Sequence, residues 1–378
     1  MSVSEYLQTQ PLLRVSATLL MGIVIGNEFV SLVSHPPLLL PWLWISVTMA
    51  FVVASIVLKD KPYSQSVFLF IAILFAGIYM VDDAKRETSF PFCHSGPIAY
   101  EAVVASEPQI RGKTLSCDLA IMAIEGKQLG KAINVKAHIL RDTITNDWRK
   151  IQLCSGIVAQ SVMSPLKNYH DGNFNYERWL RCHGFRATTF IFNTDWQISQ
   201  VSLKPLGIIG RMRLKVLDIR RKLICALMLD DNDSQHSAIV SAMVLGDRQA
   251  LSHDTKEAFS VSGASHVLAL SGLHLSIIYF ILSFLLGQHN KHIAFSQGGI
   301  IISLWFYVLL VGMTPSIVRS AVMLSIYSIC RVGGRDHVSI NALSLAAICL
   351  MVANPMCVYD VGFLSNVIHG GVGYIGAL

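Results

Sequence analysis

Apolar residues cluster at the two ends of the chain and leave a more polar stretch between them. Near the N-terminus, three apolar segments cover residues 12–33, 38–58 and 67–81. A membrane-spanning helix needs roughly 20 apolar residues, so the first two predict full spans and the third lies near the lower limit. The first segment lacks the cleavage site of a signal peptide, and we expect it to be retained. Its GxxxG pair, Gly22 and Gly26, predicts close helix packing.

Basic residues in the loops of this region predict its orientation. Lys59 and Lys61 lie between the second and third segments, whereas residues 34–37 contain no Lys or Arg. Cytoplasmic loops carry an excess of Lys and Arg. The chain is therefore predicted to start inside the cell, and its third span is predicted to end on the outer face.

Residues 89–200 change to an alternating pattern. Short runs of alternating or apolar residues lie at residues 98–105, 115–124, 133–140, 152–162 and 185–192. A period of two is typical of strands with one buried face. Together with a short helix over residues 176–182, these strands predict a small barrel like the oligonucleotide-binding (OB) fold, or alternatively a small sandwich. The third span would deliver this domain outside the cytoplasm.

A basic amphipathic segment follows. Apolar residues recur at helical spacing from Ile208 to Leu227, and seven basic residues lie between Lys204 and Lys222. So many basic residues conflict with an outside location under the positive-inside rule. We interpret residues 204–262 as interfacial helices whose basic flanks are also suited to phosphates, with a plain solvated face as the alternative.

The second apolar cluster predicts further spans over residues 266–286, 293–311, 316–330 and 338–352, with another apolar start at Val358. The loops at residues 288–292 and 331–337 carry Lys291, Arg331 and Arg335, which predicts that both loops are cytoplasmic. The chain would then re-enter from outside near His266, in agreement with the orientation of the first cluster. Arg319 would lie one turn into a helix from the outer side.

Polar residues gather where the second cluster begins. The stretch from Val261 to Ser276 contains His266, Ser271 and His274 and runs straight into an apolar segment. Polar groups in a membrane need a protein partner or an aqueous cavity, so these side chains form a candidate site. The alternative for Ser271 and Gly272 is that they allow a neighbouring helix to pack closely.

The composition supports the membrane interpretation independently. Charged residues make up 14% of the chain, against about 25% in an ordinary soluble domain, and the mean hydropathy is +0.51. The predicted fold is a polytopic α-helical membrane protein with an inserted small extracytoplasmic OB-like β-barrel. We divide it into N-terminal transmembrane helices (1–88), the OB-like domain (89–203), interfacial helices (204–262) and a second transmembrane domain (263–378).

Cysteine placement suggests one crosslink. Of the eight cysteines, Cys93, Cys117, Cys154 and Cys182 fall in the predicted outer domain. An oxidising compartment allows thiols to pair, and Cys117 with Cys154 is the preferred bridge, with unpaired buried thiols as the alternative. No His/Cys spacing typical of a zinc site occurs in the sequence.

Several short motifs follow one another in the second half of the chain. They are Leu245-Gly-Asp-Arg248, Ser265-His-Val-Leu-Ala-Leu-Ser-Gly-Leu-His274, Gly312-Met-Thr-Pro-Ser-Ile-Val-Arg319, Asn341-Ala-Leu with Asn354-Pro355, and Asp360-Val-Gly-Phe-Leu-Ser365. In this order they resemble the ComEC family of competence proteins. Residues 171–176 and Gly184 similarly resemble the end of that family's extracytoplasmic region. The resemblance implies a multi-pass inner-membrane channel that passes one DNA strand into the cell during natural transformation.

The chain departs from the family pattern near its C-terminus. Gly362-Phe363 runs directly into Leu364-Ser365, and the expected apolar helix becomes the stretch from Asn366 to Gly373. The metallo-β-lactamase-like domain of some family members has no counterpart here. We therefore expect the N-terminal half of such a protein, acting as a transport protein and not as an enzyme, without cofactor or metal.

A route for a charged strand through the bilayer must replace water with polar side chains and cations. Ser271, Gly272, His274, Asn341 and His266 are the candidates to line it, and Arg319 is the candidate to attract phosphate at its outer mouth. The alternative for Arg319 is snorkelling to lipid headgroups.

The outer domain offers candidates for contact with the strand. They are Phe174, Tyr176, Arg178 and Trp179, because aromatic and basic side chains together hold single strands. The alternative is that these aromatic residues are core. The expected partners are single-stranded DNA, the lipid bilayer and other competence machinery proteins, and a homo-oligomer is left open.

Two other function classes remain open from the sequence. Ala269-Leu-Ser-Gly272 approaches the GxSG pattern of rhomboid peptidases, which suggests an intramembrane serine peptidase with Ser271 as nucleophile and a histidine of another helix as base. The pattern lacks its first glycine. A small-molecule transporter is the third option.

Overall fold

The computed structural model describes residues 10–32, 40–88, 96–142, 146–168, 175–229, 234–247, 251–264, 271–286, 293–333, 340–360 and 362–363. The chain forms two compact units. The first comprises residues 1–89, 289–298 and 322–378, and the second comprises residues 90–288 and 299–321. The fourfold division predicted from the sequence stays a prediction.

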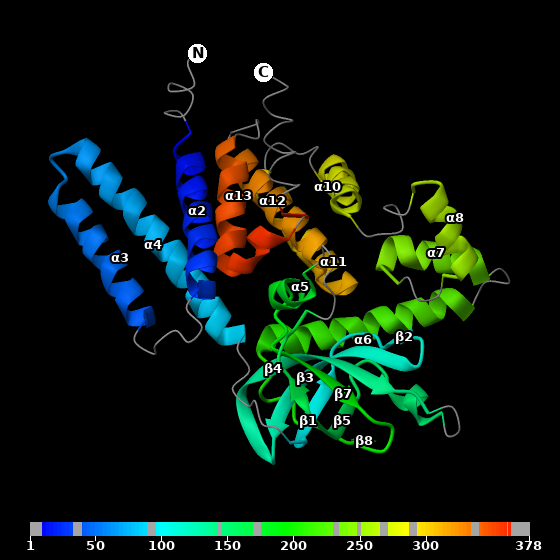
Figure 1. Cartoon of the computed structure of the whole chain (residues 1–378). Coiled ribbons are helices and arrows are strands. Elements are labelled where there is room, and N and C mark those ends of the chain that lie inside the picture. Colours follow the sequence, from blue (N-terminus) through cyan, green and yellow to red (C-terminus); the bar gives the residue numbers. More distant parts are fainter. Residues whose placement is uncertain are drawn as a thin grey trace. The chain divides into compact units, whose positions relative to one another are not determined.

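The first unit is helical. Its members are α2 (Pro11–Leu32), α3 (Leu40–Val57), α4 (Pro62–Thr88) and α13 (Ile340–Ala353), followed by the 3-10 turn η3 (Pro355–Tyr359). Helices α3, α4, α2 and α13 follow one another side by side (Figure 1). The N-terminal helices match their predicted positions, except that α4 is longer because it continues through Asp82 to Thr88. The apolar start predicted at Val358 is part of η3.

Glycines decide how closely α2 and α4 approach each other. A Cβ atom on Gly22 would meet the backbone of Leu74, and one on Gly26 would lie 2.8 Å from the Cα of Ile78. No other residue type fits at these positions without moving one of the two helices. The packing role predicted for the GxxxG pair is confirmed.

The second unit contains an eight-stranded mixed sheet over residues 98–198, which we call the strand domain. Its strands are β1 (Ile98–Val104), β2 (Gln109–Arg111), β3 (Thr114–Ile124), β4 (Lys127–Leu140), β5 (Gly156–Ser161), β6 (Met163–Ser164), β7 (Ala187–Ile191) and β8 (Trp196–Ile198). The pairings are antiparallel except between β4 and β7, which are parallel. All five predicted strands are present, and the helix predicted over 176–182 is α5 (Tyr176–Cys182).

The strand order β6-β7-β4-β3-β1-β5-β8 is open, so the predicted OB-like barrel, closed or partly closed, is not supported. The sheet nevertheless curves around an interior that includes Leu119, Ile121, Val135 and Ile139. Strand β5 pairs with β1, and β6, which follows it directly along the chain, pairs with β7. Alternation of side chains fixed which face is buried, but it carries no information about whether the two ends of a sheet join.

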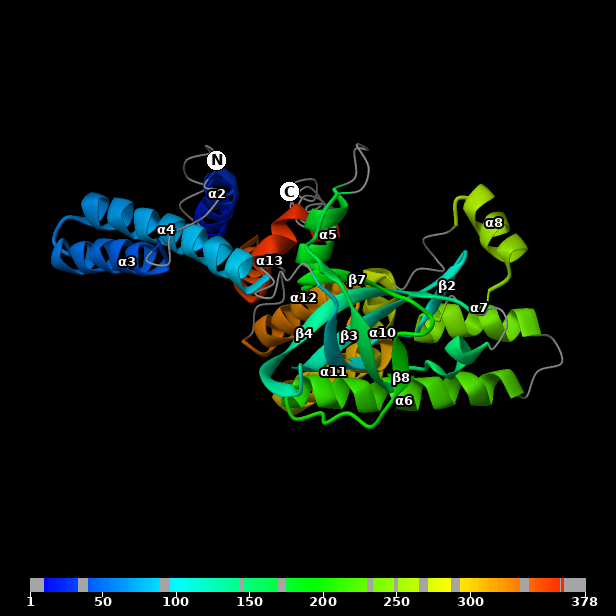
Figure 2. The ribbon, with the colours of Figure 1, turned by 60° about the horizontal axis from the view of Figure 1, so that its bottom comes forward.

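A long helix, α6 (Ile208–Leu229), covers part of the outer face of this sheet (Figure 2). Its Leu214 packs against Val103, Ala120 and Met122 of strands β1 and β3. Helices α7 (Ser234–Leu245), α8 (His253–Val261) and α10 (Gly272–Leu286) follow. Helices α11 (Ile293–Val311) and α12 (Pro315–Val332) each contain a boundary between the two units.

Among the described residues, three helices are long and apolar enough to cross a membrane, and they are α2, α4 and α11. Helices α3, α10 and α13 are apolar but shorter. A membrane location is therefore compatible with the structure, as the composition predicted.

Candidate functional site

The first candidate site lies at the start of α10. Ser271 directly precedes this helix, and its backbone N–H donates to Nδ1 of His274 over 3.3 Å. The Ser271 hydroxyl oxygen lies 3.1 Å from the same ring nitrogen. A side chain at the third helical position that accepts from the N-cap amide is one half of a capping box. His274 thus takes the place of the usual Glu or Gln.

The next residue, Gly272, is the point where α10 meets α12. A Cβ atom on Gly272 would lie 3.3 Å from the Cβ of Ser320 and would collide with the Ser320 hydroxyl. Arg319, which precedes Ser320, is 8% exposed. The structure therefore brings Ser271, Gly272 and His274 to the same end of α12 as Arg319, and it supports the close-packing interpretation of Gly272. His266 lies outside the described residues.

Asn341 belongs to the first unit. Its Oδ1 accepts a hydrogen bond from the backbone N–H of Leu12 over 3.3 Å, where α13 meets the start of α2. This amide lies in the first turn of α2 and has no partner within its own helix. Asn341 therefore has a capping role in the structure, and its predicted place in a translocation route stays a prediction.

The aromatic candidates of the strand domain lie on α5. The rings of Tyr176 and Trp179 stack with centroids 5.9 Å apart, and Trp179 lies 4.1 Å from the ring of His183. Tyr176 packs against the small core around Leu180, which favours the core alternative for Tyr176. Trp179 and Arg178 are exposed, so their contact with DNA stays a prediction. Phe174 lies outside the described residues.

The predicted disulfide is not present in the structure. Cys117 and Cys154 are both free thiols. Cys117 is buried in the interior of the curved sheet, whereas Cys154 packs on the other face, where its thiol donates to the Leu214 carbonyl over 3.5 Å. Membership of one domain does not specify which side of the sheet each cysteine faces, and these two face opposite sides. Cys93 lies outside the described residues.

The motif Leu245-Gly-Asp247 ends α7 in a defined way. Gly246 has φ +80°, a left-handed conformation that glycine adopts without strain, and its N–H bonds to the Ala242 carbonyl. The last carbonyls of a helix lack partners within it. Here Arg220 Nε donates to the Leu245 carbonyl over 2.8 Å, and the Tyr307 hydroxyl donates to the Val244 carbonyl over 2.9 Å. These hydrogen bonds fix the end of α7 and therefore the point at which the chain continues to Asp247.

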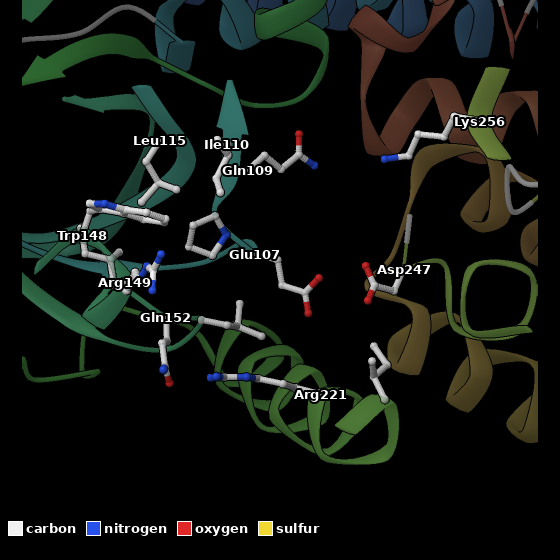
Figure 3. Close-up of a pocket in the computed structure, with 14 residues that line it drawn as sticks. Glu107, Gln109, Ile110, Leu115, Trp148, Arg149, Gln152, Arg221, Asp247 and Lys256 are labelled. Carbon is white, nitrogen blue, oxygen red and sulfur yellow. The ribbon is translucent and has the colours of Figure 1, made fainter. Parts of the chain in front are cut away.

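Asp247 lines a second candidate site, a cavity of about 870 Å³. The remaining polar lining comes from Glu107 after β1, from Gln109 of β2, from Trp148 and Arg149 of the 3-10 turn η1 (Asp147–Lys150), from Gln152, from Arg221 of α6 and from Lys256 of α8. Figure 3 shows the carboxylates of Glu107 and Asp247 facing each other across the cavity. The amine of Lys256 reaches toward it from α8 (Figure 3).

Burial raises the pKa of Glu107 above its usual value of 4.5. The nearby guanidinium of Arg220 lowers this pKa, Asp247 raises it and Arg221 lowers it, in decreasing order of effect. Burial outweighs the two arginines. The cavity therefore holds an acidic centre of partly desolvated carboxylates within a set of basic side chains.

No pattern along the chain predicts this cavity as a whole. Asp247 was part of a quoted motif, but Glu107, Trp148 and Lys256 are separated from it along the chain and from one another. No local spacing connects them. Within the described ranges, no group of three or more His, Cys, Asp or Glu residues is arranged to hold a metal ion.

Comparison with known proteins bears on the second half of the chain. Residues 243–372 match the family model of the competence protein. We call this stretch the competence domain. The competence domain includes Asp247, the start of α10 and Arg319, so both candidate sites draw residues from it.

The chain is also similar to ComE operon protein 3 of Bacillus subtilis (strain 168). The two are 24% identical over 299 residues, which cover 77% of this chain and 35% of that relative. The chain thus spans about a third of the relative's length. No solved structure gives a significant match. The resemblance drawn from the motifs is confirmed.

Proposed function

We propose that the chain is part of a multi-pass inner-membrane protein that takes up single-stranded DNA during natural transformation. The match of residues 243–372 to the competence family carries this proposal. The apolar helices support a membrane location. Other proteins of the competence machinery are the proposed partners, and a channel is the proposed mode of transport.

The packed end of α10 and α12 is the proposed part of the route. Polar groups inside a bilayer are retained where they meet a partner or water. Arg319 is 8% exposed, which leaves little of its side chain for contact with lipid headgroups and supports a role within the protein. A buried guanidinium there offers a fixed positive charge to a passing phosphate.

The test measures surface binding and internalisation of labelled DNA in the strain that encodes the full-length protein. Deleting the gene should abolish internalisation. Arg319→Ala should do the same while DNA still binds at the cell surface, and Arg319→Lys should retain part of the uptake because it keeps the charge. Arg331→Ala, at the other end of α12, is the matched control. Normal internalisation with Arg319→Ala at wild-type protein levels would reject this route.

The cap geometry adds a second comparison. His274→Gln keeps an acceptor for the Ser271 amide and should retain more uptake than His274→Ala. Ser271→Ala should be mild, because a channel needs no nucleophile. Equal loss with both histidine variants would show that the imidazole does more than cap the helix.

One observation favours a second function. Ser271 Oγ and His274 Nδ1 are 3.1 Å apart, which is within reach for a serine activated by a base. The histidine lies in the first turn of α10, the helix that Ser271 precedes, and not on another helix. Its Nδ1 also accepts a hydrogen bond from the Ser271 amide. Complete loss of function with Ser271→Ala alone would favour the intramembrane peptidase.

A further inference from the structure

We propose that the cavity lined by Glu107, Trp148, Arg149, Arg221, Asp247 and Lys256 binds one nucleotide of a single strand. The inference rests on the proposed DNA uptake and names the place where the strand domain and the competence domain hold the strand together. The volume of about 870 Å³ lies within the usual range of ligand sites.

Trp148 and Arg149, which both line the cavity, provide the stacking surface. The guanidinium of Arg141 lies 4.4 Å from the centroid of the Trp148 ring, and that of Arg149 lies 5.4 Å from it. Bases stack on aromatic rings and on planar guanidinium groups, and such contacts tolerate any sequence. Trp148 also packs against the core of the strand domain, which holds the ring in place.

Positive charge lies where the strand backbone would run. Arg149 and Lys256 are exposed, and Arg221 of α6 is half-buried. They come from three separate elements around the cavity (Figure 3). Lysine and arginine side chains that neutralise phosphates supply most of the sequence-independent affinity for a strand.

The two carboxylates decide which part of the nucleotide enters. Glu107 and Asp247 repel phosphate, but a carboxylate accepts hydrogen bonds from the amino group of a base, as Glu and Asp accept from cytosine. The base therefore occupies the centre, and the phosphates stay near the basic side chains. This arrangement predicts tighter binding of oligo-dC than of oligo-dT, because thymine lacks an exocyclic amino group.

The experiment measures fluorescence anisotropy of labelled oligonucleotides with the purified full chain in detergent. Trp148→Ala should weaken binding about tenfold or more. Arg149→Ala and Lys256→Ala should each weaken binding. Each should also make the negative slope of log affinity against log salt shallower by about 0.7. Lys127→Ala removes the same charge from the exposed start of β4, outside the cavity, and should bind like wild type. Glu107→Gln should reduce the preference for oligo-dC.

Trp148→Ala also removes core packing, so Trp148→Phe and a thermal unfolding curve accompany it. The phenylalanine variant should keep most of the affinity. If the wild type binds the strand and Trp148→Ala, Arg149→Ala and Lys256→Ala bind it with the same affinity, the cavity is not the binding site. Such a result would overturn the proposed site without contradicting the proposed DNA uptake. Equal affinity for deoxycytidine monophosphate and for oligo-dC would overturn a strand site in favour of a free nucleotide. Unchanged DNA internalisation after gene deletion would instead reject the proposed function.

Discussion

Burial changes the acid chemistry of individual side chains in the strand domain. Cys117 is fully buried inside the curved sheet, and burial raises its pKa to about 12, with Asp118 adding to the rise and Lys136 opposing it. The thiolate is the reactive form of cysteine. A thiol with such a pKa, closed off from solvent, has neither the charge nor the access that alkylation needs.

Cys117 should therefore resist maleimide at pH 8 in the folded protein, both with and without reductant. The exposed Cys225 should react readily and serves as the control. Mass spectrometry of labelled peptides gives the measurement, and unfolding in denaturant should make Cys117 reactive. Protection that disappears on adding reductant to folded protein would instead reveal the disulfide predicted from the sequence.

Glu107 offers a second prediction at this scale. Its pKa is raised in the folded state by burial, against the effects of Arg220 and Arg221 and with that of Asp247. Folding therefore disfavours the ionised carboxylate of Glu107. This destabilisation of the folded protein is fully present above the folded-state pKa, and it disappears as the pH falls toward the unfolded-state pKa of 4.5. Glu107→Gln should raise the thermal midpoint at pH 7 and have little effect near pH 4.

The control for this prediction is Glu125→Gln, which removes an exposed carboxylate at the turn between β3 and β4. Differential scanning fluorimetry at both pH values compares the two variants. A gain from Glu107→Gln that is equal at pH 7 and pH 4 would contradict burial of the charge as its cause.

At the scale of elements, small residues set how helices approach. Gly272 of α10 faces Ser320 of α12, just as Gly22 and Gly26 of α2 face α4. Helices in a membrane gain little from burying apolar surface against each other, so van der Waals contact at small residues drives their packing. A side chain added at such a contact must displace its neighbour.

Gly272→Val should therefore destabilise the folded protein by about 1 to 3 kcal/mol, because overpacking forces the helices apart. Gly272→Ala should cost less, since the atom it meets first is the rotatable hydroxyl of Ser320. Adding Ser320→Ala should recover part of the loss from Gly272→Ala, which a double-mutant cycle of thermal stability measures. The absence of coupling between the two positions would contradict direct contact.

At the scale of the whole molecule, the membrane topology remains the main prediction. The positive-inside rule places the loops at Lys59, Lys291 and Arg335 in the cytoplasm and residues 89–203 outside. A reporter that works only in the cytoplasm should be inactive when fused after Asp195 and active when fused at Lys59. Activity after Asp195 would reverse the orientation of the strand domain.

Elements whose signals are local could be predicted from the sequence. The helix at Tyr176–Cys182, the amphipathic α6 and the apolar α11 lie where periodicity and composition placed them, because side-chain pattern and length act within one segment. The ordered motifs likewise identified the competence domain. These features depend on neighbours only a few residues apart.

The tertiary structure alone decided what depends on distant neighbours. It set Cys117 and Cys154 on opposite faces of the sheet, left the strand order open and gave Asn341 the start of α2 as its partner. It also assembled the cavity, in which Glu107 faces Asp247. The physical reason is that strand pairing and helix packing join segments far apart along the chain, and a local pattern specifies which face is buried but not which residues it meets.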